Sequence, residues 1–183
     1  GMNLDIEYIM PAHGIIWKDY IADIIETYKG IAAQKVENKA VIVYESVWKH
    51  TQQIAESLAE GFSDAGMDVK VYKLSDTKSS IVMREIMDAK VVCIGSGTYN
   101  NVMAPSVAAF LEHIRPCKFK NKKGLAFAAY GWFNQVAKEI DTRMQQSGIE
   151  SCHDVINQCY TPSDDQLEDY FNVAKEIAKN CQE

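Results

Sequence analysis

Three features that would mark a membrane, secreted or nucleic-acid-binding protein are missing from this sequence. No apolar run approaches the eighteen or so residues that a bilayer-spanning helix needs. The first residues show neither the basic flank nor the apolar core of a secretory signal. Because 19 Lys and Arg are set against 25 Asp and Glu, the net charge of −6 does not favour binding to a phosphate backbone. We therefore expect a soluble protein with no nucleic-acid and no membrane partner.

Paired cysteines are missing as well. The five cysteines are odd in number and widely spaced, which fits neither a disulfide framework nor pairs of zinc ligands. They stand at Cys93, Cys117, Cys152, Cys159 and Cys181. This cysteine usage predicts a reducing, cytoplasmic location.

The length of 183 residues and the hydrophobic content of 47% predict one globular domain with a short appendage. The organisation of the sequence changes near Asn38. We expect residues 39–183 to form one domain and residues 1–38 to be a separate segment that includes a linker helix. Gly1 before Met2 is typical of an expression remnant and carries no information about the fold.

From Lys39 onward, short β-branched runs alternate with amphipathic segments, as in repeated βαβ units. Two of these runs, VIVY and VVCIG, are continuously apolar, which is typical of parallel strands covered on both faces. Five strands are expected, at residues 40–44, 69–74, 90–95, 124–129 and, less regularly, 149–156.

Helical spacing separates these runs. Apolar residues recur every three or four positions in residues 54–62, after Pro105, and in residues 136–144, and Gly66 and Gly148 are stop signals. A capping box at residues 163–166 begins a last helix. The pattern predicts an α/β fold, a doubly wound flavodoxin-like sandwich whose five-stranded parallel sheet has the order 2-1-3-4-5 and helices on both faces.

In such a sheet, ligands bind beyond the carboxyl ends of the strands, where the strand order reverses. The loop after the first strand would contribute six residues to this site: Ser46, Val47, Trp48, Lys49, His50 and Thr51. Hydroxyls, free backbone N–H groups and the positive end of a helix dipole together suit a dianionic phosphate. The pattern is not a P-loop. A helix start capped by Ser or Thr is the alternative interpretation of this loop taken alone.

Two further loops are expected at the same edge. The loop after the third strand contains Ser96, Gly97, Thr98, Tyr99, Asn100 and Asn101. The loop after the fourth strand contains Ala129, Tyr130, Gly131, Trp132 and Phe133. Small residues allow backbone to approach a flat ligand, and aromatic side chains can cover a ring face. Three polar and aromatic loops at one edge favour a planar, phosphorylated cofactor over an ordinary capped helix.

Three segments carry a resemblance to a known family: VIVYESVWKHTQQIAESLAEG, IGSGTYNNVMAPSVAAFLEHI and GLAFAAYGWF. In this order and spacing they resemble the flavodoxin domain of flavodiiron proteins, also called A-type flavoproteins. The resemblance runs from about Lys39 to the end, and the stretch TYNN-x-x-x-PSVAAFLE is its most specific part. It implies an FMN cofactor and electron transfer.

The segment before Asn38 extends the resemblance. Residues 9–17 are similar to the end of the metallo-β-lactamase-like domain that precedes the flavodoxin domain in this family, where the position of His13 is an iron ligand. The family's H-x-E-x-D-H ligand pattern is missing here, so we expect no metal in this chain, and His13 would ligate iron only in a full-length parent. The chain would then be either trimmed at a domain boundary or a natural fragment, and Gly1 favours trimming.

By this resemblance, residues 46–51 would hold the FMN phosphate, and Trp48, Tyr99 and Trp132 would shield the isoalloxazine ring. The backbone at Gly97 and Gly131 would meet its polar edge. The sequence departs from the family in three places. Lys49-His50 stands where relatives have Gly and a small polar residue, Gly97 replaces Pro, and Phe133-Asn134 replaces glycines.

The resemblance implies that electrons pass from a rubredoxin-type or flavin reductase donor to a di-iron centre, which reduces oxygen or nitric oxide. That centre would belong to the missing domain and act across a head-to-tail homodimer. The main alternative is a stand-alone NAD(P)H or quinone reductase, which would be bleached rapidly by NAD(P)H alone. A response-regulator receiver is disfavoured because Glu45 is a lone acid and Ser96 occupies the phospho-acceptor position. No catalytic residue is predicted.

Overall fold

The structure is a computed structural model that describes residues 5–182. The chain divides into two compact units, residues 1–35 and residues 36–183. In the first unit, Ile9 and Trp17 exchange two backbone hydrogen bonds of 2.9 and 3.0 Å, and α1 (Ile21–Ala32) follows with no buried residue. Within residues 5–182, no helix combines the length and the apolar character that crossing a bilayer requires.

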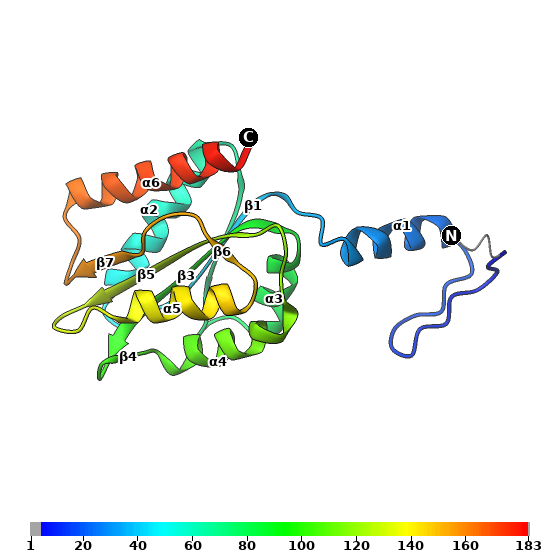
Figure 1. The fold of residues 1–183 in the computed structure, drawn as a ribbon, viewed down its shortest axis with the longest axis horizontal. Coiled ribbons are helices and arrows are strands. Elements are labelled where there is room, and N and C mark those ends of the chain that lie inside the picture. The colour runs from blue at the N-terminus through cyan, green and yellow to red at the C-terminus, as the bar shows by residue number, and fades with distance from the viewer. Residues whose placement is uncertain (1–4, 183) are drawn as a thin grey trace. The chain divides into compact units, whose positions relative to one another are not determined.

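The second unit is built on a sheet in the order β2-β1-β3-β5-β6, and these neighbours are all parallel (Figure 1). Its strands are β1 (Glu37–Glu45), β2 (Asp68–Lys73), β3 (Ala89–Tyr99), β4 (Val102–Met103), β5 (Lys123–Tyr130), β6 (Glu150–Ser151) and β7 (Ile156–Cys159). Because β4 is a short antiparallel addition to β3, the main strands have the predicted order 2-1-3-4-5. The predicted fold class is confirmed.

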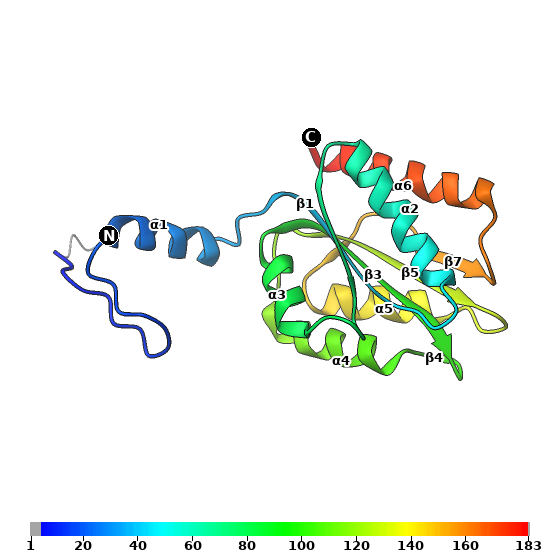
Figure 2. The same ribbon diagram turned by 180° about the vertical axis from the view of Figure 1, so that it is seen from behind.

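Helices cover both faces of this sheet (Figures 1 and 2). They are α2 (His50–Asp64) and α6 (Asp164–Gln182) on one face, and α3 (Ser79–Met87), α4 (Pro105–Ile114) and α5 (Val136–Gln146) on the other, with a 3₁₀ turn η1 (Arg115–Cys117). Alternate residues of β1 enter the two cores, since Ala40 and Ile42 pack with α2 and α6 whereas Val41 and Val43 pack with the other helices. Burial on both faces explains why this strand is continuously apolar.

The predicted capping box is confirmed at the start of α6. The Ser163 N–H donates to Gln166 Oε1 at 3.0 Å, and the Gln166 N–H donates to Ser163 Oγ at 3.3 Å. These reciprocal bonds satisfy two backbone donors at the helix start.

The prediction of one strand at residues 149–156 is wrong in its middle part, which is not in a strand. It is split into β6 and β7, which both pair with β5. Between the two pairings, Gly124 to Phe127 of β5 spans three steps while Ser151 to Ile156 spans five, so two extra residues leave the ladder. The strand therefore resumes at Ile156, the last residue of the expected range, and runs to Cys159, which brings the following residue, Tyr160, to the edge where the cofactor was expected.

Two other elements differ from the expectation. β1 begins at Glu37, inside the segment expected to precede the domain, because the Glu37 N–H donates to the Asp88 carbonyl at 2.7 Å. Helix α3 was not expected, because it is short and buries only Val82 and Ile86, and two apolar positions do not establish a helical period.

Lys122 is buried at the opposite end of the sheet, with 2% of its surface exposed. Its Nζ donates to the carbonyls of Met87 and Ala89 at 3.0 and 2.8 Å, where α3 ends. Burial lowers the pKa of Lys122 to about 8, an effect that Asp88 opposes and Lys39 assists. Charge on this amine therefore disfavours the folded state at neutral pH.

We expect the free energy of unfolding to rise with pH relative to a Lys122→Met variant. The folded pKa of about 8 lies below the ordinary value of 10.5, so the unfolded chain binds more protons between these two values. The gain in the free energy of unfolding is complete above the pKa of the unfolded chain, and it is lost as the pH falls through the pKa of the folded protein. Urea unfolding at pH 7.5 and 9.5 should show a relative gain of about 2 kcal/mol for the parent chain. An equal dependence of the free energy of unfolding on pH in the two proteins would contradict this expectation.

Candidate cofactor site

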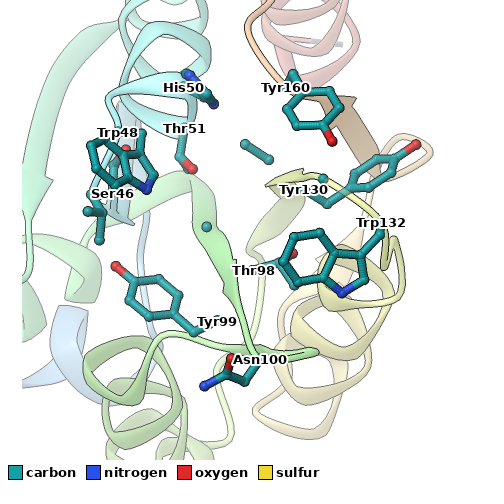
Figure 3. A pocket seen from close by; sticks show the side chains of 14 residues that line it. Ser46, Trp48, His50, Thr51, Thr98, Tyr99, Asn100, Tyr130, Trp132 and Tyr160 are labelled. Carbon is teal, nitrogen blue, oxygen red and sulfur yellow. The ribbon is translucent and has the colours of Figure 1, made fainter.

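A cavity of about 400 Å³ lies at the carboxyl ends of β1, β3 and β5, where the strand order reverses (Figure 3). Three loops contribute most of its wall. The lining residues are Ser46, Val47, Trp48, His50, Thr51, Gly97, Thr98, Tyr99, Asn100, Ala129, Tyr130, Gly131, Trp132 and Tyr160. The loops that the sequence expected to converge therefore do converge.

The first loop joins the end of β1 directly to α2. Helix α2 begins at His50, and Thr51, in its first turn, lines the cavity although only 1% of the residue is exposed. The first N–H groups of a helix have no intrahelical acceptor, and they carry the positive end of its dipole. Glu45 fixes the base of the loop, since its carboxylate accepts the Ser46 N–H at 3.0 Å and the Ser106 hydroxyl at 3.2 Å. The site offers hydroxyls and free donors suited to an anion.

Lys49 occupies a backbone conformation that favours glycine. It precedes α2 with φ of 67°, in the left-handed region. This is the position where the resemblance expected glycine in relatives, and the side chain is not among the residues that line the cavity. A residue with a Cβ is strained there by an amount on the order of 1 kcal/mol.

We expect Lys49→Gly to raise the free energy of unfolding by about 0.5–1 kcal/mol, because relief of the left-handed strain exceeds the extra entropy of glycine in the unfolded chain. Lys138→Gly is the matched control. Lys138 is an exposed residue inside α5, so its replacement should lower the free energy of unfolding by about 1 kcal/mol. Thermal or urea unfolding measures both changes, and destabilisation by Lys49→Gly would disprove the expectation.

The second loop is a hairpin rather than a simple strand end. β3 continues to Tyr99, past the expected end at residue 95, because Thr98 and Tyr99 pair with β4. Asn100 and Asn101 make the turn with φ of 46° and 68°, which asparagine tolerates well. Tyr99 faces the cavity, and its burial, assisted by the charge of Glu45, raises the pKa of its hydroxyl.

The third loop is joined to the second by two hydrogen bonds. Trp132 Nε1 donates to Asn101 Oδ1 at 3.1 Å, and Thr98 Oγ1 donates to the Phe133 carbonyl at 3.4 Å. Trp132 is 81% exposed and Trp48, from the first loop, is 80% exposed, although both line the cavity. Two large aromatic surfaces are thus available to a bound ring system.

All but four of the predicted site residues lie in the cavity wall; the exceptions are Lys49, Ser96, Asn101 and Phe133. Ser96 is fully buried, and its hydroxyl accepts the Ala104 N–H at 2.8 Å and donates to the Gly97 carbonyl at 2.7 Å. Asn101 and Phe133 hold the second and third loops together through the bonds to Trp132 and Thr98. These three residues support the wall instead of forming it.

Sequence reasoning missed Tyr160. Its ring lies 3.5–3.7 Å from the position that a Cβ on Gly131 would occupy, so it forms the wall beside the third loop. The signal was an aromatic residue directly after a strand, but the expected strand ended at residue 156 and placed Tyr160 away from the edge.

No group of three His, Cys, Asp or Glu side chains that could hold a metal occurs in the part of the chain that the structure describes. His13 is exposed and belongs to the first unit.

The site fits FMN in its chemistry. One end is the start of a helix with hydroxyl side chains, which suits a phosphate. The rest is an aromatic slot between Trp48, Tyr99, Trp132 and Tyr160, whose volume lies in the usual range for cofactor sites. A doubly wound sheet of order 2-1-3-4-5 with such a site at its switch point defines a protein of the flavodoxin class.

Comparison with known proteins identifies the family. Residues 42–173 match the flavodoxin family model, so the chain belongs to the flavodoxin family. It is 40% identical to the nitric oxide reductase of Moorella thermoacetica over 81% of this chain and 37% of that protein. It also resembles the rubredoxin oxygen:oxidoreductase of Desulfovibrio gigas, with a TM-score of 0.92 and 33% identity over 96% of this chain and 44% of that one. The flavodiiron protein of Giardia intestinalis gives a TM-score of 0.89 and 27% identity over 97% and 44%.

These matches confirm the predicted resemblance to the flavodoxin-like domain of flavodiiron proteins. FMN is the cofactor that the fold and the family imply. The chain spans less than half the length of these three proteins, at 37%, 44% and 44%.

Proposed function

We propose that residues 36–183 bind FMN and transfer electrons as one module of a longer oxidoreductase. One observation carries this proposal: the start of α2 and the aromatic slot lie in the same open cavity. FMN supplies one-electron and two-electron redox chemistry when it is bound. The chain itself supplies binding, orientation and the surroundings of the ring.

The role of each loop follows from its chemistry. The hydroxyls of Ser46 and Thr51, with the N–H groups at the start of α2, would receive the phosphate. Trp48, Tyr99 and Trp132 would cover the ring and keep water from its faces. The backbone at Gly97 and Gly131 would meet the polar edge of the ring, because neither residue has a side chain that would hold it away.

Electron exchange needs an accessible ring edge. The exposed side chains of Val47, Trp48 and Trp132 border the cavity and offer an apolar contact surface to a redox partner. We assign the donor to a rubredoxin-type protein or a flavin reductase. The acceptor would be a di-iron centre of the parent protein, reached across a homodimer, with oxygen or nitric oxide as its substrate.

In this proposal, residues 1–38 are the end of a preceding metallo-β-lactamase-like domain and a linker helix. The division of residues 1–35 from the sheet as a separate unit, and the lack of buried residues in α1, support this assignment, whereas residues 36–38 belong to the second unit. The five cysteines are all free, which supports a reducing cytoplasmic location.

The test is a titration of the purified chain with FMN, followed by visible absorbance and flavin fluorescence. Saturable binding, and reversible bleaching by dithionite under anaerobic conditions, are expected. NADH or NADPH alone should bleach the bound flavin slowly or not at all. Rapid bleaching by either would favour a stand-alone NAD(P)H reductase, and no bound flavin at saturating FMN would overturn the proposal.

A further inference from the structure

Tyr160 is held in the cavity wall from two sides. On one side, the Tyr160 N–H donates to the Tyr130 carbonyl at 2.8 Å, which joins it to the third loop. On the other side, the hydroxyl of the next residue, Thr161, lies 3.1 Å from Nε2 of His50 at the start of α2. His50 and Tyr160 both line the cavity, and Figure 3 shows them facing it from different elements.

This second contact links parts of the chain that are far apart in sequence. His50 and Thr161 are 111 residues apart. One belongs to the helix start assigned to the phosphate, and the other belongs to the connection from β7 to α6. The hydrogen bond therefore ties the start of α2 to the segment that carries Tyr160.

Tyr160 needs such support. Its φ of 57° lies in the left-handed region, which is costly for a bulky aromatic residue. It is also 61% exposed, so packing against other side chains restrains it only partly. Hydrogen bonds at Tyr160 and at Thr161 restrain the backbone here, and the ring lies beside Gly131.

The chemistry of the pair suits a lasting contact. Nε2 accepts the Thr161 hydroxyl proton when the ring carries its proton on Nδ1, and it donates to the same oxygen when the proton is on Nε2. The contact is therefore compatible with either tautomer of His50.

We propose that His50 is a positioning residue for the flavin ring, acting through Thr161 to hold Tyr160 against the cavity. This inference rests on the proposed flavin-binding function. It assigns His50 to the ring end of the site, in contrast to the phosphate role that its place in the first loop suggests.

Riboflavin, which has the ring but no phosphate, separates these two roles. The experiment measures the Kd of riboflavin and of FMN, with the visible circular dichroism of the bound flavin, for His50→Ala, Thr161→Val and their double variant. Thr161→Ser keeps the hydroxyl and tests rescue, Tyr160→Ala gives the spectrum without the ring, and Thr142→Val on α5 is the matched control.

We expect His50→Ala and Thr161→Val each to raise the riboflavin Kd about threefold to tenfold, as for the loss of one hydrogen bond. The double variant should be no weaker than either single one, since both remove the same contact. The spectra of these variants should shift toward that of Tyr160→Ala, and Thr161→Ser should restore affinity and spectrum.

Two outcomes would overturn the inference while the proposed function stands. One is a loss of FMN affinity with riboflavin affinity unchanged, which would make His50 a phosphate contact. The other is an unchanged Kd and spectrum for Thr161→Val, whose side chain is exposed and whose replacement does not disturb the core. Failure of the parent chain to bind either flavin would overturn the proposed function together with the inference.

Discussion

Thr51→Asp is expected to weaken FMN binding about a thousandfold while riboflavin binding stays near that of the parent chain. The reason is electrostatic. A carboxylate at the start of α2 would lie beside the phosphate, and two like charges about 4 Å apart at a protein surface repel by about 4 kcal/mol. Riboflavin carries no phosphate, so the new charge has nothing to repel.

The neutral variant Thr51→Asn is the matched control for this prediction. Asp and Asn have nearly the same shape, and both are tolerated at helix starts, so the difference between them isolates the charge. Fluorescence titration with both flavins gives the four affinities. If Thr51→Asp weakened FMN and riboflavin equally, the phosphate would lie elsewhere and the assignment of the first loop would be wrong.

The location of this site followed from features that sequence reports directly. The apolar runs of β1 and β3 predicted parallel strands covered on both faces, and the sheet order then placed the loops after them at the switch point. The loops that converge on the cavity are the predicted ones. Apolar patterning carries this information because it is repeated over many residues.

Other features depend on single backbone angles or on pairings between distant segments. The left-handed conformation of Lys49 has no side-chain signal, because lysine rarely adopts it. β7 and Tyr160 reach the site since two residues leave the ladder between β6 and β7, and a strand pattern does not locate such an interruption. The role of Ser96 was equally hidden, because its serine hydroxyl is turned inward to the Ala104 N–H.

The contact between α2 and α6 is another feature that only the structure reveals, and it explains Gly61. A Cβ added to Gly61 would lie 2.2 Å from the Phe171 carbonyl oxygen and 2.8 Å from the Ala174 Cβ. Nearby, the Ser57 hydroxyl donates to the Leu167 carbonyl, so the two helices touch over consecutive turns. Only glycine allows the backbones to approach this closely.

Gly61→Ala is therefore expected to lower the free energy of unfolding by about 2 kcal/mol, because overpacking at the upper end of its usual range costs about 3 kcal/mol. Helix propensity acts in the opposite direction, because alanine favours a helix over glycine by about 1 kcal/mol. Ser63→Ala, at an exposed position of α2, is the control and should change little. Urea unfolding of the three proteins measures the difference.

A more stable Gly61→Ala variant would show that α6 moves aside without cost. Since α6 begins directly after the segment that carries Tyr160 and Thr161, that outcome would also mean that this side of the cavity is not held by helix packing.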